Sequence, residues 1–166
     1  RQGEKKMKRL LSALFMSSFV IFAQSYDFNT LEGLNESLRV IEIAYRAGAS
    51  EKDPYHYEKA RAYSKVSMYL ASEEDTIGSK IFAIKSMNSA SKALSDAKGL
   101  DPIEFYTQYN DPLINLTELN EKLLFVRENK GDKCASVELA KAEASYEGLT
   151  YEVKKKKPNS IVVLKL

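Results

Sequence analysis

Few side chains in this chain of 166 residues have the chemistry of a catalytic site. His56 is the only histidine and Cys134 is the only cysteine. A histidine that acts as a general base needs an orienting partner and a nucleophile, and no motif in the sequence supplies either of them. We therefore expect His56, which stands between Tyr55 and Tyr57, to be a surface residue in the first turn of a helix.

Cys134 comes just before the last predicted helix, and a helix N-terminus makes a thiol more reactive. Because no second histidine and no signature of a cysteine hydrolase accompanies it, we interpret Cys134 as a structural residue at the start of that helix. A disulfide to another molecule and a reactive thiol are the alternatives. One cysteine cannot form an intramolecular disulfide, so the fold must depend on its apolar core.

The sequence indicates neither a metal site nor a phosphate-binding loop. Metal ligands cluster at fixed spacings, whereas Glu73-Glu74-Asp75 is a contiguous run that we interpret as a solvated turn. The glycines stand singly, which excludes a glycine-rich loop for phosphate. We expect a protein that is not an enzyme and has no catalytic residue, cofactor or metal ligand.

Tyrosines are the candidate residues for binding a ligand or a partner. The chain has ten tyrosines and no tryptophan, and we single out Tyr45, Tyr55, Tyr63 and Tyr69. We expect these rings to pack in the core and at its rim, because a tyrosine can bury its ring while its hydroxyl stays hydrated. The alternative is a groove in which the rings stack against a glycan or a peptide.

The first 25 residues have the order of a secretory signal peptide. Basic residues between Lys5 and Arg9 precede a mostly apolar run, Leu10–Ala23, and small residues follow it. The run is shorter than the about 20 residues that a membrane-spanning helix needs. We expect cleavage after Ser25, with cleavage after Ala23 as the alternative, and no membrane span after cleavage. The protein is then periplasmic, and an association with the outer membrane stays open.

The charge of the remaining chain excludes a nucleic-acid-binding protein. The whole sequence has 25 basic and 23 acidic residues, but residues 1–25 hold five of the bases and one acid. The rest is therefore slightly acidic, and it lacks the clustered lysines and arginines that phosphates attract. The one basic cluster, Lys154–Lys157, is typical of a solvated helix end, and contact with anionic lipid or cell-wall polymer is the alternative.

Helical periodicity runs through the whole region after the leader. Apolar residues recur at spacings of three and four, and this pattern predicts about five helices with one inward face each. The expected inward residues are, in chain order, Leu31, Leu34, Leu38, Ile41 and Tyr45; Ala62, Val66 and Tyr69; Ile77, Ile81, Ile84, Met87, Leu94 and Ala97; Leu116, Leu119, Leu123 and Val126; and Leu139, Ala142, Tyr146, Leu149 and Val153.

Local signals mark where these helices begin and end. Asp53-Pro54 predicts a helix start, because the aspartate caps free amides and proline fits the first turn. Asp75 or Thr76 is expected to cap the next helix, which Gly99 ends. Two further Asp-Pro steps predict a short helix from Pro102 to about Tyr109 and a longer helix after Asp111-Pro112. The last helix is expected over about 136–156.

These elements predict an all-α fold. Short links between long helices favour an antiparallel, up-and-down bundle of helical hairpins over residues 26–158. A tetratricopeptide-like array is the related fold to exclude, and its repeat of 34 residues is not evident. Residues 159–166 form a separate C-terminal tail, in which Ile161–Leu166 is mostly apolar and β-branched. A strand, a stub that packs on the bundle and the edge of a longer protein are the alternatives for this tail.

Several segments resemble the bacterial envelope family of domain of unknown function 4398. The resemblance lies in Ile43–Ala49, with its Gly-Ala step, in Pro54–Tyr63, and in the Ala-rich Ala90–Lys98. A further segment, Cys134–Ala144, looks like one that often follows in such proteins, although Ser136 stands where proline is usual.

The resemblance implies a helical module of the periplasm or the outer membrane, and it brings no catalytic residues. Relatives often precede an OmpA-type domain that holds peptidoglycan, and this chain stops at Leu166, where that domain would begin. We expect a scaffold or protein-interaction module whose partner is an envelope protein or is associated with peptidoglycan. The alternative is a periplasmic module that takes a peptide or glycan in a tyrosine-lined groove.

Overall fold

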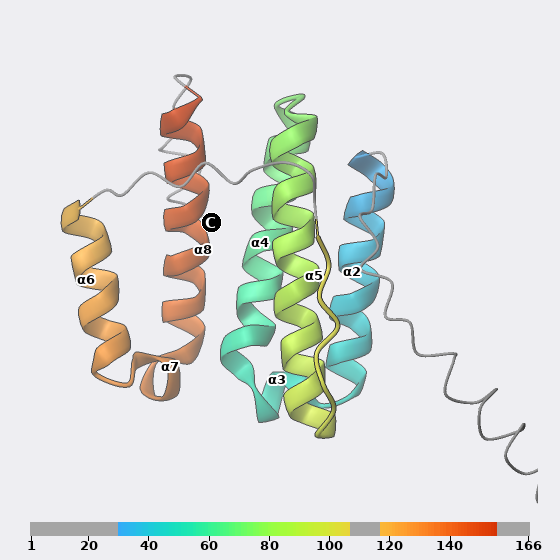
Figure 1. Cartoon of the computed structure of the whole chain (residues 1–166), viewed down its shortest axis with the longest axis vertical. Coiled ribbons are helices and arrows are strands. Elements are labelled where there is room, and N and C mark those ends of the chain that lie inside the picture. Colours follow the sequence, from blue (N-terminus) through green and yellow to red (C-terminus); the bar gives the residue numbers. More distant parts are fainter. Residues whose placement is uncertain (1–29, 107–116, 156–166) are drawn as a thin grey trace, which may run out of the picture.

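The computed structural model describes residues 30–106 and 117–155, and these residues form a bundle of helices (Figure 1). Seven helices lie in the described ranges, and five of them have 12 residues or more. The helices are α2 (Thr30–Arg46), α3 (Ala49–Lys52), α4 (Pro54–Ser72), α5 (Thr76–Lys98), α6 (Thr117–Glu128), α7 (Gly131–Cys134) and α8 (Ser136–Lys154). The prediction of an all-α bundle is confirmed. The predicted leader and C-terminal tail lie outside the described residues.

The antiparallel hairpin of α4 and α5 is the centre of the bundle. Helix α2 packs on α5, α8 packs on α4, and α6 packs on the outer side of α8 (Figure 1). One apolar core joins α2 to α4 and α5, and a second joins α4 and α5 to α8. Within the described ranges, no helix has the length and apolarity that crossing a membrane requires.

The predicted helix boundaries in the central hairpin are confirmed. The carboxylate of Asp53 accepts a hydrogen bond from the His56 amide at 3.2 Å, and Pro54 is the first residue of α4. Asp75 is the cap of α5, since its side chain accepts from the Gly78 amide at 3.0 Å. Gly99 ends α5 in the left-handed conformation, with φ of 67°, which glycine adopts without strain.

The predicted inward face of α2 is largely wrong. Leu31 and Tyr45 are 68% and 56% exposed, and Leu38 is also exposed. The buried face carries mainly short side chains, namely Gly33, Ser37, Val40, Ile41 and Ala44. Short side chains on this face allow the axis of α2 to approach those of its neighbours closely.

Serine hydroxyls fill the close contacts between the central helices. Ser67 Oγ of α4 donates to the carbonyl of Ser79 at 2.7 Å, and Ser86 Oγ of α5 donates to the carbonyl of Ala60 at 2.8 Å. Each of these two buried hydroxyls therefore has a partner on the other helix, which offsets the cost of burying a polar group. The small residues of α5 permit this close helix approach.

The prediction of an inward position is also wrong for three residues on other helices. Ile77 and Val126 are exposed, and so is Ala142 on α8. On α8, the predicted inward residues Leu139 and Leu149 are buried, and the buried face also includes Ala140 and Ala144, which were not predicted. The reason is again that α8 approaches α4 through alanines, whose small side chains do not stand out in a pattern of large apolar residues.

The short helix predicted after Asp101-Pro102 is wrong over the residues that the structure describes. Residues 100–105 are not helical and run back along α5. The Ile103 amide donates to Ser91 Oγ at 2.7 Å, and Asn88 bonds both the amide and the carbonyl of Phe105. Side chains of α5 thus satisfy the backbone groups that a helix would have paired internally.

Candidate functional site

An open cleft of about 480 Å³ lies beside α4 and α5, where α6 and α7 also contribute to its wall. Its lining combines aromatic rings with polar groups and includes three cationic side chains. The lining residues are Tyr55, His56, Lys59, Tyr63, Lys85, Asn88, Ser89, Arg127 and Asp132.

The structure brings together two of the four predicted tyrosines in this cleft. Tyr55 is half-buried, and Tyr63 is buried with its hydroxyl directed to α8. Tyr45 lies on the exposed face of α2, with its ring centre 6.2 Å from that of Tyr57. Tyr69 packs against the second core. The four rings therefore do not form one continuous surface.

Glu143 of α8 is the centre of a buried polar network behind the cleft. Its carboxylate accepts hydrogen bonds from the Tyr55 hydroxyl, from Lys59 Nζ at 2.7 Å and from the Arg127 guanidinium. Burial tends to raise the pKa of Glu143, but these three donors together hold the pKa below the usual glutamate value. The buried carboxylate is therefore ionised, and it connects α4, α6 and α8.

Glu147 repeats this arrangement one turn further along α8. It accepts from the Tyr63 hydroxyl at 2.7 Å and from Lys85 Nζ at 2.6 Å. Burial and the neighbouring Glu147 carboxylate raise the pKa of Tyr63 well above its usual value, so its hydroxyl stays protonated and donates. We call Tyr55, Lys59, Tyr63, Glu143 and Glu147 the α4–α8 polar seam.

Sequence reasoning missed the polar seam, although a signal for it was present. Tyr55, Lys59 and Tyr63 are four residues apart, and so are Glu143 and Glu147. Residues four apart share a helix face, so each of these two sets of polar residues was detectable in the sequence by itself. Their pairing was not detectable, because the hydrogen-bonded partners are 84 to 88 residues apart in the chain.

The seam also decides what the cleft can bind. Lys59 and Arg127 are compensated by Glu143, and Lys85 is compensated by Glu147. An anionic ligand would therefore compete with carboxylates that are already in place. The remaining features, which are ring faces and the hydroxyl of Ser89, suit a polar, uncharged ligand better.

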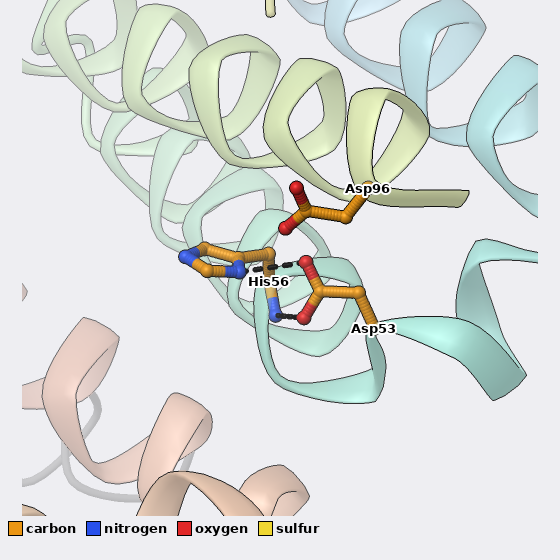
Figure 2. A group of neighbouring side chains, drawn as sticks. All are labelled: Asp53, His56 and Asp96. Atoms are coloured by element: carbon orange, nitrogen blue, oxygen red, sulfur yellow. Dashed lines mark hydrogen bonds and ion pairs between the residues drawn. The ribbon is translucent and has the colours of Figure 1, made fainter. Parts of the chain in front are cut away.

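His56 lines the same cleft and belongs to a second group of side chains (Figure 2). Its Nδ1 is 2.7 Å from Asp53 Oδ2, and Asp96 of α5 faces the same place. The possible ligand atoms of the three residues all lie within 4.8 Å of one another. Burial tends to raise the pKa of Asp53, but the hydrogen bonds from His56 outweigh it and leave the pKa lowered.

The expectation that His56 lacks an orienting partner is wrong. Asp53, three residues earlier, holds the imidazole with the same carboxylate that caps α4. The histidine side chain is 33% exposed, and its ring meets that of Tyr55 edge-on. An Asp-His pair beside a cleft provides the orienting half of a general base. The backbone amide and Nδ1 of His56 both bond to Asp53 rather than to a nucleophile. The expectation of a non-catalytic protein stays a prediction.

Cys134 lies away from this site. It is the last residue of α7, it is exposed, and Ala135 rather than Cys134 is the N-cap of α8. No packing role supports the interpretation of Cys134 as a structural residue. Its exposure leaves the thiol accessible to a thiol of another molecule.

Acid is expected to weaken the attachment of α8 to the bundle. The folded pKa of Glu143 is below the ordinary value of 4.5, and the pKa of Asp75, which pairs with Lys155 at 2.5 Å, is lowered as well. Such groups stabilise the folded state above their unfolded pKa, and this stabilisation is lost as the pH falls through the folded pKa. The urea concentration at the midpoint of unfolding should therefore be lower at about pH 3 than at pH 7.

The variant Glu143→Gln serves as the control for the acid effect, because an amide does not titrate. Its midpoint should change less between the two pH values than that of the unmodified protein. An equal change in both proteins would show that Glu143 does not contribute to the acid sensitivity.

Comparisons with protein-family models, with curated proteins and with solved structures found no match for this chain, so the resemblance to the envelope family stays a prediction.

Proposed function

We propose that this protein is an exported, non-catalytic helical scaffold that binds another protein of the cell envelope through exposed faces of its helices. The observation that carries the proposal is the outer surface of α6. Leu124, Phe125 and Val126 are consecutive large apolar residues, all exposed, and Phe125 is 67% exposed. None of residues 118–128 is buried, so this helix contributes little to the core.

A second apolar face lies on α2, at the opposite side of the bundle (Figure 1). Leu31, Leu38 and Tyr45 are spaced by seven residues and are exposed. Exposed apolar side chains that form a continuous strip are typical of a surface that binds another protein. An amphipathic helix of the partner would bury these residues in the same way as helices pack within the bundle.

The sequence supports the location in this proposal. The basic, apolar and small-residue order of the first 25 residues is typical of export, and the family resemblance favours the envelope. The intact mass of the protein recovered from the cell envelope tests export. A mass that begins at Tyr26 supports cleavage of the leader, whereas retention of residues 1–25 would contradict it.

A photo-crosslinking residue placed at Phe125 tests partner binding in cells. We expect an adduct of one defined mass, because a specific partner covers this position. The matched control carries the same crosslinker at Lys65, which is exposed on α4 and lies outside both apolar faces. The proposal requires the Phe125 adduct to disappear when Leu124 is changed to serine. Equal adducts from Lys65 and Phe125, or no adduct from Phe125, would overturn it.

The cleft favours a second candidate function, the binding of a peptide or glycan. Two aromatic rings, Tyr55 and Tyr63, line a hollow large enough for a small polar ligand. Titration with soluble peptidoglycan fragments, followed by NMR, tests this candidate. Shifts at Asn88 and Ser89 that vanish in the Tyr55→Ala variant but persist in Tyr45→Ala support it, and the absence of shifts at these two residues contradicts it.

A further inference from the structure

We propose that Asp53, His56 and Asp96 form a binding site for a divalent transition-metal ion. The three side chains come from the start of α4 and the end of α5, and they point into one space (Figure 2). A site of this kind is independent of the proposed partner surface, because α2 and α6 contribute none of its ligands.

The geometry is close to that of a bound ion. Zinc lies about 2.0–2.2 Å from nitrogen and oxygen ligands, so ligand atoms on one ion are about 3–3.5 Å apart. His56 Nδ1 is already 2.7 Å from Asp53 Oδ2, and the candidate atoms of all three residues lie within 4.8 Å of one another. A bound ion would replace the hydrogen bond between Nδ1 and Oδ2, and side-chain rotations would adjust the three separations.

The backbone that holds these ligands is well anchored. The other oxygen of Asp53, Oδ1, accepts from the His56 amide at 3.2 Å, which orients the carboxylate while Oδ2 faces the imidazole. Lys52 Nζ donates to the Ala97 carbonyl at 2.9 Å and connects the end of α3 to the end of α5 beside Asp96. Ligands on anchored helix ends lose little freedom when they bind an ion.

The donor set identifies the class of metal. Two carboxylates and one imidazole suit zinc, manganese or iron, whereas calcium and magnesium prefer oxygen ligands throughout. Water would complete the coordination. Lys92 Nζ pairs with Asp96 at 2.7 Å, so the ammonium group competes with the metal for this carboxylate.

Calorimetric titration of Zn²⁺ into the full chain tests the proposal. We expect one ion per chain and a loss of affinity of at least about tenfold when any ligand is replaced. The ligand variants are His56→Gln, Asp53→Asn and Asp96→Asn. Asparagine also caps helices well, so Asp53→Asn removes a charged ligand and keeps the start of α4. The control is Glu73→Gln, which changes an exposed carboxylate outside the site.

The Lys92→Gln variant should raise the affinity for Zn²⁺, whereas the ligand variants lower it. Removal of the competing ammonium group should strengthen Zn²⁺ binding if Asp96 is a ligand, whereas Lys98→Gln, an exposed position on the same helix, should leave it unchanged. Lys98→Gln also removes one positive charge from α5, so a gain confined to Lys92→Gln reports the release of Asp96 rather than the change in net charge.

The single histidine provides a readout that needs no variant. Zn²⁺ should shift the imidazole NMR signals of His56 in the unmodified protein, and bound Co²⁺ should give visible absorption bands. Unchanged His56 signals at saturating Zn²⁺ would overturn the proposal, as would equal affinities of the unmodified protein and His56→Gln. Failure of Lys92→Gln to strengthen binding would exclude Asp96 as a ligand and overturn the site as proposed.

Discussion

Replacement of Phe82 by alanine is expected to lower the free energy of unfolding by about 3–5 kcal/mol, which is the usual cost of removing a buried phenylalanine ring. Phe82 lies on α5 and is 0% exposed. Its ring centre lies 6.0 Å from that of Tyr63 and 5.8 Å from that of Tyr151. One side chain therefore joins α5 to both α4 and α8. The cavity left by alanine would lie where three helices meet, and surrounding side chains cannot fill it completely.

Urea unfolding followed by circular dichroism at 222 nm measures this effect. The matched control is Phe125→Ala, which removes the same ring from the exposed face of α6 and should change the stability by less than about 0.5 kcal/mol. The pair also separates two roles, because Phe125→Ala should weaken partner crosslinking while the fold stays intact. Equal losses of stability in both variants would contradict the placement of Phe82 in the core and Phe125 on the surface.

Replacement of Glu143 by alanine is expected to destabilise the protein by about 2–4 kcal/mol, because it leaves the largely buried ammonium group of Lys59 and the half-buried hydroxyl of Tyr55 without their acceptor. Lys59 loses its ion pair, and its side chain is only 14% exposed, so water compensates for little of the loss. Tyr55 and Arg127 lose the same acceptor. Because these donors lie on α4 and α6, the substitution should loosen the contacts of α8 in particular.

Hydrogen exchange of the α8 amides, together with urea unfolding, measures this effect. Glu138→Ala is the matched control, since Glu138 is exposed in the first turn of α8 and contributes only a weak interaction with the helix dipole. A double-mutant cycle between Lys59 and Glu143 isolates their interaction. A coupling energy near zero would contradict the central role that the polar seam has in attaching α8.

The start of α4 shows how much the sequence determined about the candidate metal site. The Asp-Pro step and the position of His56 in the first turn were readable, because a cap bonds to an amide only three residues away. The contribution of Asp96 was not readable. It depends on α5 returning antiparallel to α4 in one particular register, which brings a residue 40 positions later to the same place.

Helix α2 shows the same division for the core. Its extent followed from local periodicity, but the large residues Leu31, Leu38 and Tyr45 suggested the wrong face. Periodicity identifies an apolar face without showing which neighbour covers it. In the tertiary structure α2 buries its face of short side chains, which lets it approach the central hairpin closely.

The sequence by itself determined that this protein is helical and where its central helices begin and end. These properties depend on hydrogen bonds and torsion angles within a few residues, as Asp53, Asp75 and Gly99 show. Only the tertiary structure decided which helix faces are buried, that Tyr55 and Tyr63 meet Glu143 and Glu147, and that Asp96 joins His56. These contacts are between residues far apart in the chain, and their free energy depends on how closely whole helices pack, which no local pattern contains.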